Sequence, residues 1–225
     1  MNEVVIAPSI LAMDFTKMTE QMQELNESKA KWIHFDVLDG HFAPNLSFGP
    51  EIFKGLRAST DKVLDVHLMV TDAYRWIPIF AKLGADMITV HAETFFNQVD
   101  DIKRAINHIH ECGCQAGIAI KPHTTIQKFE PLLELVEMIL VMGVEPGFGG
   151  QQFMEDMLFK VDWLNYKREE HNLNFRIEMD GGINKETAVY AFEHGCDTLV
   201  AGSYVFKNGI KESVEDLLTC LQQYA

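Results

Sequence analysis

The chain has 225 residues, of which 47% are hydrophobic and 23% are charged, a composition that allows a substantial core and argues against global disorder. Its net charge of −14, without a cluster of Lys or Arg, argues against nucleic acid and anionic membranes as partners. Because no apolar run approaches the ~18 residues of a membrane span and the start MNEVVIAPSI does not resemble a signal peptide, we expect a soluble, cytoplasmic protein.

Apolar, β-branched runs alternate with amphipathic stretches along the whole chain. The runs predict strands at 4–10, 32–38, 63–69, 87–93, 115–120, 138–144, 175–180 and 198–205. Helices are clearest at 14–28, 96–113 and 214–225. The apolar faces of the first two are expected to hold Phe15, Met18, Met22 and Leu25, and Val99, Ile102, Ile106 and Ile109.

This alternation predicts a parallel sheet, because parallel strands need helical crossovers between them. Eight strand–helix units in a chain of 225 residues predict a closed (β/α)8 TIM barrel, as a single domain over 1–225. The alternative is an open doubly wound sheet, which usually carries G-x-G-x-x-G after its first strand. Here that position reads APSILAMD, and no linker or change of composition divides the chain.

Polar side chains collect near the carboxyl ends of the predicted strands, where barrel enzymes have their active sites. His34 and Asp36 share one face of their strand because side chains alternate with a period of two, and Ile33, Phe35 and Val37 take the other face. If the shared face points into the barrel, His34, Asp36, His67 and Asp180 converge from three strands. Two imidazoles and two carboxylates suit zinc, iron(II), manganese or cobalt. The alternative is that each residue is a hydrogen-bonded structural group.

Three glycine-rich segments follow the sixth, seventh and eighth predicted strands: 142–151, 180–184 and 201–203. Glycines allow the backbone to approach a ligand closely and to present its N–H groups. The loops after strands seven and eight form the usual phosphate site of this fold. The sequence therefore predicts a phosphorylated ligand, held locally by an otherwise acidic protein.

Other polar residues have no assigned role. The four cysteines are scattered and are expected to be buried or half-buried thiols rather than metal ligands (Cys112, Cys114, Cys196 and Cys220). Three histidines and one glutamate lie at or near strand ends, where ordinary hydrogen-bonded roles are as plausible as functional ones (His41, His91, His123 and Glu93).

Seven motifs, in order, resemble the ribulose-phosphate 3-epimerase family: IAPSILAMDF, WIHFDVLDGHFAPN, LDVHLMV, AIKPHT, VMGVEPGFGGQQF, IEMDGGIN and LVAGSYVF. The resemblance runs from about residue 5 to 207. It implies an isomerase of the pentose phosphate pathway that interconverts D-ribulose 5-phosphate and D-xylulose 5-phosphate with one bound divalent metal ion.

The resemblance also implies roles for individual residues. The metal ligands would be His34, Asp36, His67 and Asp180, and the two aspartates would also be the catalytic acid/base pair. The substrate would contact Ser9, His67, Met69, Met142, Gly147, Phe148, Gly149, Gly150, Gly181, Gly182, Gly202 and Ser203. Epimerisation at carbon 3 needs one proton carrier on each face of the sugar, and the metal would stabilise the enediolate charge as a Lewis acid.

The chain departs from the family pattern at Leu38, where Met is usual, at Gly143, where Ser or Thr is usual, and at Met179, where Val is usual. These changes leave the chemistry intact and concern the shape of the sugar cavity. Lys121 occupies a position where other branches of the family carry Asn, so we expect it to be a scaffold residue. Asp39 is expected to shape the turn with Gly40 rather than bind metal.

Three other functions are compatible with parts of the pattern. A 3-epimerase of a longer ketose phosphate, such as D-allulose 6-phosphate, would need a roomier phosphate end. A metal-independent phosphosugar lyase or decarboxylase usually carries an Asp-x-Lys pair on a central strand, and HFDVLD at 34–39 has no lysine. A non-catalytic phosphosugar-binding barrel would have lost a ligand or an acid/base group, and all four are present.

The protein is expected to be a homo-oligomer, with a dimer as first guess.

Overall fold

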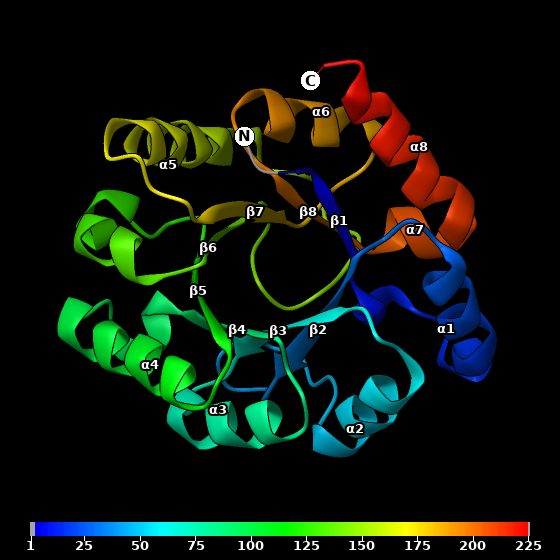
Figure 1. The fold of residues 1–225 in the computed structure, drawn as a ribbon, viewed down its shortest axis with the longest axis horizontal. Coiled ribbons are helices and arrows are strands. Elements are labelled where there is room, and N and C mark those ends of the chain that lie inside the picture. Colours follow the sequence, from blue (N-terminus) through cyan, green and yellow to red (C-terminus); the bar gives the residue numbers. More distant parts are fainter. Residues whose placement is uncertain (1–2, 225) are drawn as a thin grey trace.

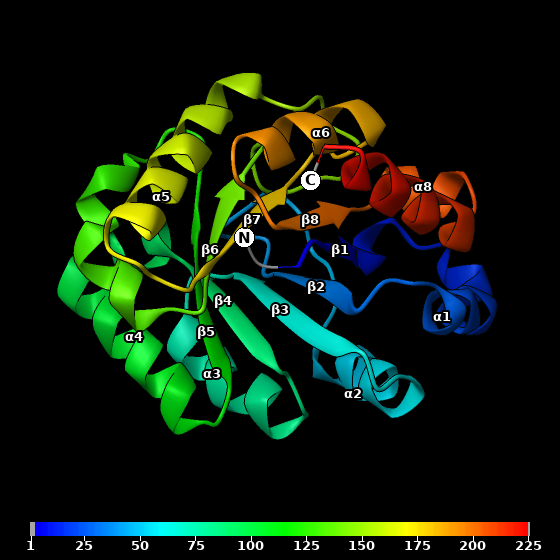
Figure 2. The ribbon, with the colours of Figure 1, turned by 45° about the horizontal axis from the view of Figure 1, so that its top comes forward.

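The computed structural model describes residues 3–224, and these form a barrel of eight parallel strands surrounded by helices (Figures 1 and 2). The strands pair in the order β1-β8-β7-β6-β5-β4-β3-β2. A parallel bridge between Ser9 and His34 joins the end of β1 to β2, so the sheet closes into a ring. The prediction of a single-domain (β/α)8 barrel is confirmed.

The strands lie close to their predicted positions. They are β1 Val5–Pro8, β2 Trp32–Leu38, β3 Val63–Met69, β4 Met87–His91, β5 Gln115–Ile120, β6 Met138–Met142, β7 Arg176–Asp180 and β8 Thr198–Ala201. The predicted bounds of β2, β3 and β5 agree with the structure. The predictions at 4–10, 87–93, 138–144 and 198–205 extended too far at their carboxyl ends, because the chain turns away once it leaves the barrel mouth, and those at 4–10 and 175–180 each began one residue early.

The crossovers are mostly α-helices. They are α1 Met18–Glu27, α2 Pro50–Ser59, α3 Ala73–Lys82, α4 Val99–Glu111, α5 Leu158–Glu170, α6 Lys185–Glu193, α7 Ser203–Lys207 and α8 Ile210–Gln222. After β5 the crossover is a 3₁₀ segment, Ile126–Leu135, with Pro131 inside it. Proline cannot donate the helical hydrogen bond, which is consistent with the absence of a regular α-helix over this segment.

The helix predictions need three corrections, the first being that the helix predicted at 96–113 is shorter, as α4 Val99–Glu111. Phe15 lies in a 3₁₀ turn before α1 and is 42% exposed, so it does not belong to the buried face. The last helix begins at Ile210 rather than 214, and Ala225 lies outside the described residues. The predicted face of α4 is confirmed, since Ile102, Ile106 and Ile109 are buried.

The main core lies between the strands and the helices. Outward-facing residues of β2, including Phe35, meet the aromatic rings of α2 and α3, with ring centroids 5.0 Å apart to Phe53 and 6.0 Å to Phe80. Burying such rings stabilises the fold by ~1.5–3 kcal/mol each. This packing fixes the outward face of β2, and therefore directs His34 and Asp36 into the barrel, as predicted.

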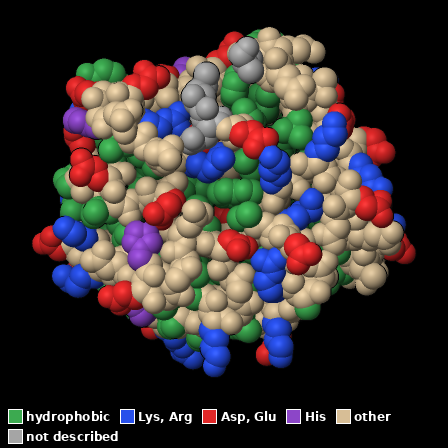
Figure 3. All heavy atoms as spheres, in the orientation of Figure 1, with side chains coloured by type: hydrophobic (Ala, Val, Ile, Leu, Met, Phe, Trp, Pro, Cys, Tyr) green, Lys and Arg blue, Asp and Glu red, His purple; other side chains and the backbone are tan. Residues whose placement is uncertain are grey.

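The face seen in Figure 3 carries acidic and basic side chains interspersed, with no broad area of either sign among the described residues drawn there. Across residues 3–224, no helix is both long and apolar enough to cross a membrane.

Candidate functional site

The parallel register of β2 and β3 brings the predicted ligands together. Asp36 pairs with His67, and His34 pairs with Asp65. All four side chains face the barrel interior, where they are almost completely buried. Asp180 ends β7 on the other side of the ring and is half-buried at the barrel mouth.

The predicted ligand set forms one cluster. Ligand atoms of His34, Asp36, His67 and Asp180 lie within 4.8 Å of one another. His34 Nε2 and His67 Nδ1 are each 3.1 Å from Asp36 Oδ1, and they lie 3.8 Å and 3.7 Å from Asp180 Oδ2. Two imidazole nitrogens that face each other at 3.3 Å beside two carboxylates form a donor set suited to a divalent cation.

The two aspartates differ in their electrostatic environment. Burial acts to raise the pKa of Asp36, but the adjacent His34 and His67 imidazoles hold it well below its usual range. Burial, and then the negative charge of Asp36, raise the pKa of Asp180 to about 6. Of the two carboxylates, Asp180 is therefore the one that takes up a proton first as the pH falls.

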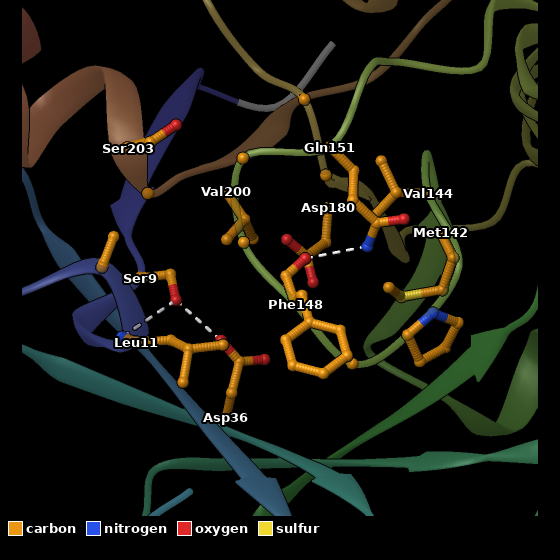
Figure 4. A pocket seen from close by; sticks show the side chains of 18 of the residues that line it. Ser9, Leu11, Asp36, Met142, Val144, Phe148, Gln151, Asp180, Val200 and Ser203 are labelled. Atoms are coloured by element: carbon orange, nitrogen blue, oxygen red, sulfur yellow. Dashed lines mark hydrogen bonds between the residues drawn. The ribbon is translucent and has the colours of Figure 1, made fainter. Parts of the chain in front are cut away.

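Ser9 links the first strand to this cluster. Its hydroxyl donates a 2.6 Å hydrogen bond to Asp36 Oδ2, and its oxygen accepts one from the Leu11 backbone at 3.3 Å (Figure 4). The bridge between Ser9 and His34 sets the position of this hydroxyl. One carboxylate oxygen of Asp36 is thus held by Ser9, while the other faces the imidazoles.

A second group of polar residues contacts His34 on the side of the ring that faces away from Asp36. Asp65 Oδ2 lies 2.6 Å from His34 Nδ1, and Glu178 Oε1 lies 3.8 Å from the same nitrogen. Glu178 is fully buried with neither carboxylate oxygen hydrogen-bonded, and burial raises its pKa well above the usual range. Asp65 therefore orients His34, and burial favours the neutral form of Glu178.

The site opens into a cavity at the carboxyl ends of the strands, where Asp36 and Asp180 lie opposite the loop that carries Phe148 (Figure 4). Every residue that the sequence suggested as a substrate contact lines this cavity except His67, which is fully buried behind Asp36. These lining residues are Ser9, Met69, Met142, Gly147, Phe148, Gly149, Gly150, Gly181, Gly182, Gly202 and Ser203.

The turn after β7 requires its two glycines. Gly181 and Gly182 have φ values of +111° and +69°, and a side chain at Gly182 would lie 2.7 Å from the backbone of Phe153. This close approach packs the turn against the segment after β6. It also places the start of α6, whose N-cap is Asn184, directly after the turn.

The loop after β6 is braced by side-chain hydrogen bonds. Gln151 Nε2 donates to the Glu145 and Phe148 carbonyls, both at 2.8 Å, and Asn45 Nδ2 donates to the Gly147 carbonyl at 2.7 Å. The loop after β2 is therefore tied to the loop after β6 across the cavity. Phe148 remains 56% exposed at its edge.

Apolar residues surround the ligand cluster on the cavity side. Leu38, Met69 and Ala43 form a small buried cluster, and Met142 packs with Val144 in another. Leu38 follows His34 and Asp36 on the inner face of β2. Leu38 is buried and keeps this side of the cluster closed to solvent.

Gly143, directly after β6, lies against Met179 of β7. A Cβ atom at Gly143 would lie 2.9 Å from the Gly181 carbonyl oxygen and 3.1 Å from Met179 Sδ. Met179 is fully buried and occupies the space that a larger residue at 143 would need. Position 143 is therefore crowded by the Gly181 backbone and by the Met179 and Phe153 side chains, and Met179 is only one of these three neighbours.

This contact predicts that the two positions are energetically coupled. Gly143→Ala should destabilise the protein by roughly 1–3 kcal/mol through overpacking, and Met179→Val by about 1–2 kcal/mol through the cavity it leaves. The double variant should lose less than the sum, which thermal or urea unfolding can measure. Gly49→Ala, which meets no atom within 4 Å, is the control and should add independently to Met179→Val. Full additivity at Gly143 would refute the coupling.

Several residues with no predicted catalytic role have structural partners. Asp39 accepts backbone hydrogen bonds from His41 and Phe42, both at 2.8 Å, and from Thr71 at 2.7 Å, so its predicted role in the turn is confirmed. Lys121 lies 3.8 Å from the centre of the Phe42 ring, as expected of a scaffold residue. The four cysteines are free and buried or half-buried, also as expected.

Sequence reasoning missed part of the site. The additional cavity residues include Leu11, Ala12, Val144, Gln151, Ile183 and Val200. They carry no chemical signal, because an apolar residue or a glutamine in a loop does not reveal which way it points. His91 and Glu93 were noted without a role, and Glu178 was not noted at all. Glu178 could have been found from the sequence, because it lies two residues before Asp180 and therefore on the same face of β7.

Comparison with known proteins agrees with the motif pattern. A family model described as "Ribulose-phosphate 3 epimerase family" matches residues 5–206. The chain is 42% identical over 204 residues to ribulose-phosphate 3-epimerase of Bacillus subtilis, covering 90% of this chain and 92% of that one. It is 39% identical to the chloroplastic ribulose-5-phosphate-3-epimerase of Arabidopsis thaliana, covering 95% and 75% of the two chains.

Solved structures with a similar fold have other activities. A 3-keto-L-gulonate-6-phosphate decarboxylase from Vibrio cholerae superimposes with a TM-score of 0.73 at 16% identity, with complete coverage of both chains. A 3-hexulose-6-phosphate synthase from Salmonella typhimurium gives a TM-score of 0.71 at 17% identity, covering 98% of this chain and all of that one. At such low identity these two structures show the shared barrel alone.

Proposed function

The chain belongs to the ribulose-phosphate 3-epimerase family, and on that basis we propose that it interconverts D-ribulose 5-phosphate and D-xylulose 5-phosphate by moving a proton at carbon 3. The observation that carries this proposal is the pair Asp36 and Asp180, which face one cavity from opposite sides of the barrel beside two histidines. The reaction fits the pentose phosphate pathway.

Asp36 and Asp180 are the proposed proton carriers. One carboxylate takes the proton from carbon 3 on one face of the sugar, and the other delivers a proton to the opposite face. Their unequal environments support this division, since a base must be ionised while its partner holds a proton. Ser9, at 2.6 Å from Asp36 Oδ2, would keep that carboxylate oriented during the transfer.

His34, Asp36, His67 and Asp180 would hold one divalent metal ion. Their donor types suit zinc, iron(II), manganese or cobalt. When bound, the ion would supply Lewis-acid stabilisation of the negative charge that develops on the sugar oxygens. Asp65, hydrogen-bonded to His34 Nδ1 at 2.6 Å, would keep the opposite nitrogen of that ring directed at the cluster.

The remaining cavity residues would bind and enclose the substrate. The glycine-rich turns after β6, β7 and β8 would present backbone N–H groups to the phosphate. Met69, Met142 and Phe148 would cover the sugar and exclude water from the reacting carbon. We also propose a cytoplasmic protein that acts as a homo-oligomer, with a dimer as first guess, and that binds neither nucleic acid nor membrane.

The nearest alternative substrate is a ketohexose phosphate such as D-allulose 6-phosphate. The hydrogen bond between Asn45 and the Gly147 carbonyl ties the loops after β2 and β6 together, and we expect this tie to limit the room for a longer sugar. We expect kcat/KM for D-ribulose 5-phosphate to exceed that for D-allulose 6-phosphate at least ~10-fold, since one misfitting carbon costs about 1–3 kcal/mol. A coupled assay on both substrates measures this ratio. Equal values, or a preference for the hexulose, would overturn the pentulose assignment.

A further inference from the structure

The imidazole of His67 has a neighbour that the site described above does not use. Its Nδ1 atom faces Asp36 Oδ1 at 3.1 Å, while its Nε2 atom lies 2.9 Å from His91 Nε2 on the adjacent strand. The other nitrogen of that second ring, His91 Nδ1, lies 3.0 Å from Glu93 Oε2. Both imidazoles are fully buried, so solvent does not compete for these contacts.

The positions of the protons along this series of hydrogen bonds, from His67 through His91 to Glu93, can be assigned. A nitrogen that binds a metal ion carries no proton, so His67 must hold its proton on Nε2 if Nδ1 is the ligand. Two ring nitrogens at 2.9 Å form a hydrogen bond only when one of them carries hydrogen, so His91 Nε2 accepts. The remaining His91 proton lies on Nδ1 and is donated to Glu93.

Resting on the proposed metal site, we propose that His91 and Glu93 are positioning residues for the metal ligand His67. Through two successive hydrogen bonds they hold the proton of His67 on Nε2 and leave Nδ1 free for the metal ion. His34 is oriented by a carboxylate directly, at 2.6 Å from Asp65. His67 reaches its carboxylate through a second imidazole.

The positioning pair is itself fixed on several sides. The His91 ring stacks on His67, with centroids 5.0 Å apart and an angle of 27° between the planes, and contacts the Phe42 ring at 4.7 Å. Glu93 Oε1 accepts a 2.9 Å hydrogen bond from the Lys121 backbone N–H, at the end of β5. His91 is therefore packed between the rings of His67 and Phe42, and Glu93 is held by the backbone after β5.

The simpler interpretation is that the pair only fills the core and ties β4 to β5. Two substitutions of His91 separate these interpretations. His91→Gln keeps an oxygen that can accept from His67 and an amide that can donate to Glu93. His91→Leu is of similar bulk and has no acceptor. His110, whose Nε2 lies 3.0 Å from Glu137 Oε2 on the outside of the barrel, is the matched histidine–carboxylate control.

The test is the dissociation constant for zinc, measured by chelator competition on the metal-free wild type and variants, with thermal unfolding to confirm folding. We expect His91→Leu to raise the zinc Kd by about 10–100-fold, and we expect His91→Gln and His110→Leu to remain close to wild type. An unchanged Kd for His91→Leu, or equal weakening by Leu and Gln, would overturn the positioning role.

The experiment also distinguishes a failure of the positioning role from a failure of folding and from a failure of the proposed metal site. If His91→Leu does not fold, Glu93→Ala removes the terminal acceptor and should also raise the zinc Kd, and an unchanged value would refute the proposal. If the wild type itself bound no zinc, iron(II), manganese or cobalt, the proposed metal site would be wrong. If the wild type bound metal and both variants matched it, only the positioning role would be wrong.

Discussion

Asp36→Asn and Asp180→Asn should each lower kcat for epimerisation by at least ~10²–10⁴-fold, the range that a positioned proton carrier contributes. Asparagine keeps the shape of the side chain but cannot accept a proton. Each variant should still carry out one of the two proton transfers, because one carboxylate still faces the sugar. In D₂O, one variant should exchange the carbon 3 proton of D-ribulose 5-phosphate and the other that of D-xylulose 5-phosphate, without interconverting them.

Asp39→Asn is the matched control for this experiment. Asp39 lies three residues from Asp36 and has the same side chain, but its oxygens accept hydrogen bonds from the turn and from Thr71 instead of facing the cavity. Its kcat should stay near that of the wild type. Metal content must be measured for each variant, because both catalytic aspartates are also proposed ligands. Near-wild-type turnover by both Asp36→Asn and Asp180→Asn would rule out the two-carboxylate scheme.

Removal of the metal ion should have a comparably large effect. Lewis-acid stabilisation contributes several kcal/mol to a reaction of this kind, so chelator-treated protein should lose activity by about 10²–10⁴-fold. Activity should return with zinc, iron(II), manganese or cobalt. Rebinding should also stabilise the fold, by about 2.7 kcal/mol at a metal concentration of 100 times Kd, which unfolding curves can detect.

The double variant His34→Gln/His67→Gln is the control for metal removal. It lacks both imidazole donors, which lie within the 4.8 Å cluster. Chelator treatment and metal addition should leave both its activity and its stability unchanged. A metal-free wild type that kept full activity would contradict the proposed role of the ion, whereas stabilisation of the double variant by metal would mean that the ion binds elsewhere.

The sequence predicted the barrel because its strands are buried on both faces. The segments 32–38, 63–69 and 115–120 are largely apolar runs between turns, with polar residues such as His34 and His67 at inward-facing positions, and their bounds agree with the structure. The end of the eighth strand could not be predicted, because SYVF is equally compatible with a strand and a helix. The structure begins α7 at Ser203, directly after Gly202.

The period of two placed His34 and Asp36 on one face of β2, and the prediction that they meet His67 and Asp180 rested on the barrel, which brings the ends of three strands together. The residues behind the cluster did not follow from it. That His91 meets His67, and that Glu178 approaches His34, depends on the stagger between strands around the ring. The contact between Gly143 and Met179 likewise became visible only when β6 and β7 were side by side.

The most direct test of the two-aspartate mechanism is to run the wild-type reaction in D₂O and to measure deuterium at carbon 3 of the product by mass spectrometry or NMR. Two carboxylates on opposite faces, Asp36 and Asp180, each exchange with solvent, so the first D-xylulose 5-phosphate formed from D-ribulose 5-phosphate should carry deuterium at carbon 3. The remaining substrate should still carry protium at early times. A product that kept the original proton would show that a single group moves it, and would contradict the mechanism.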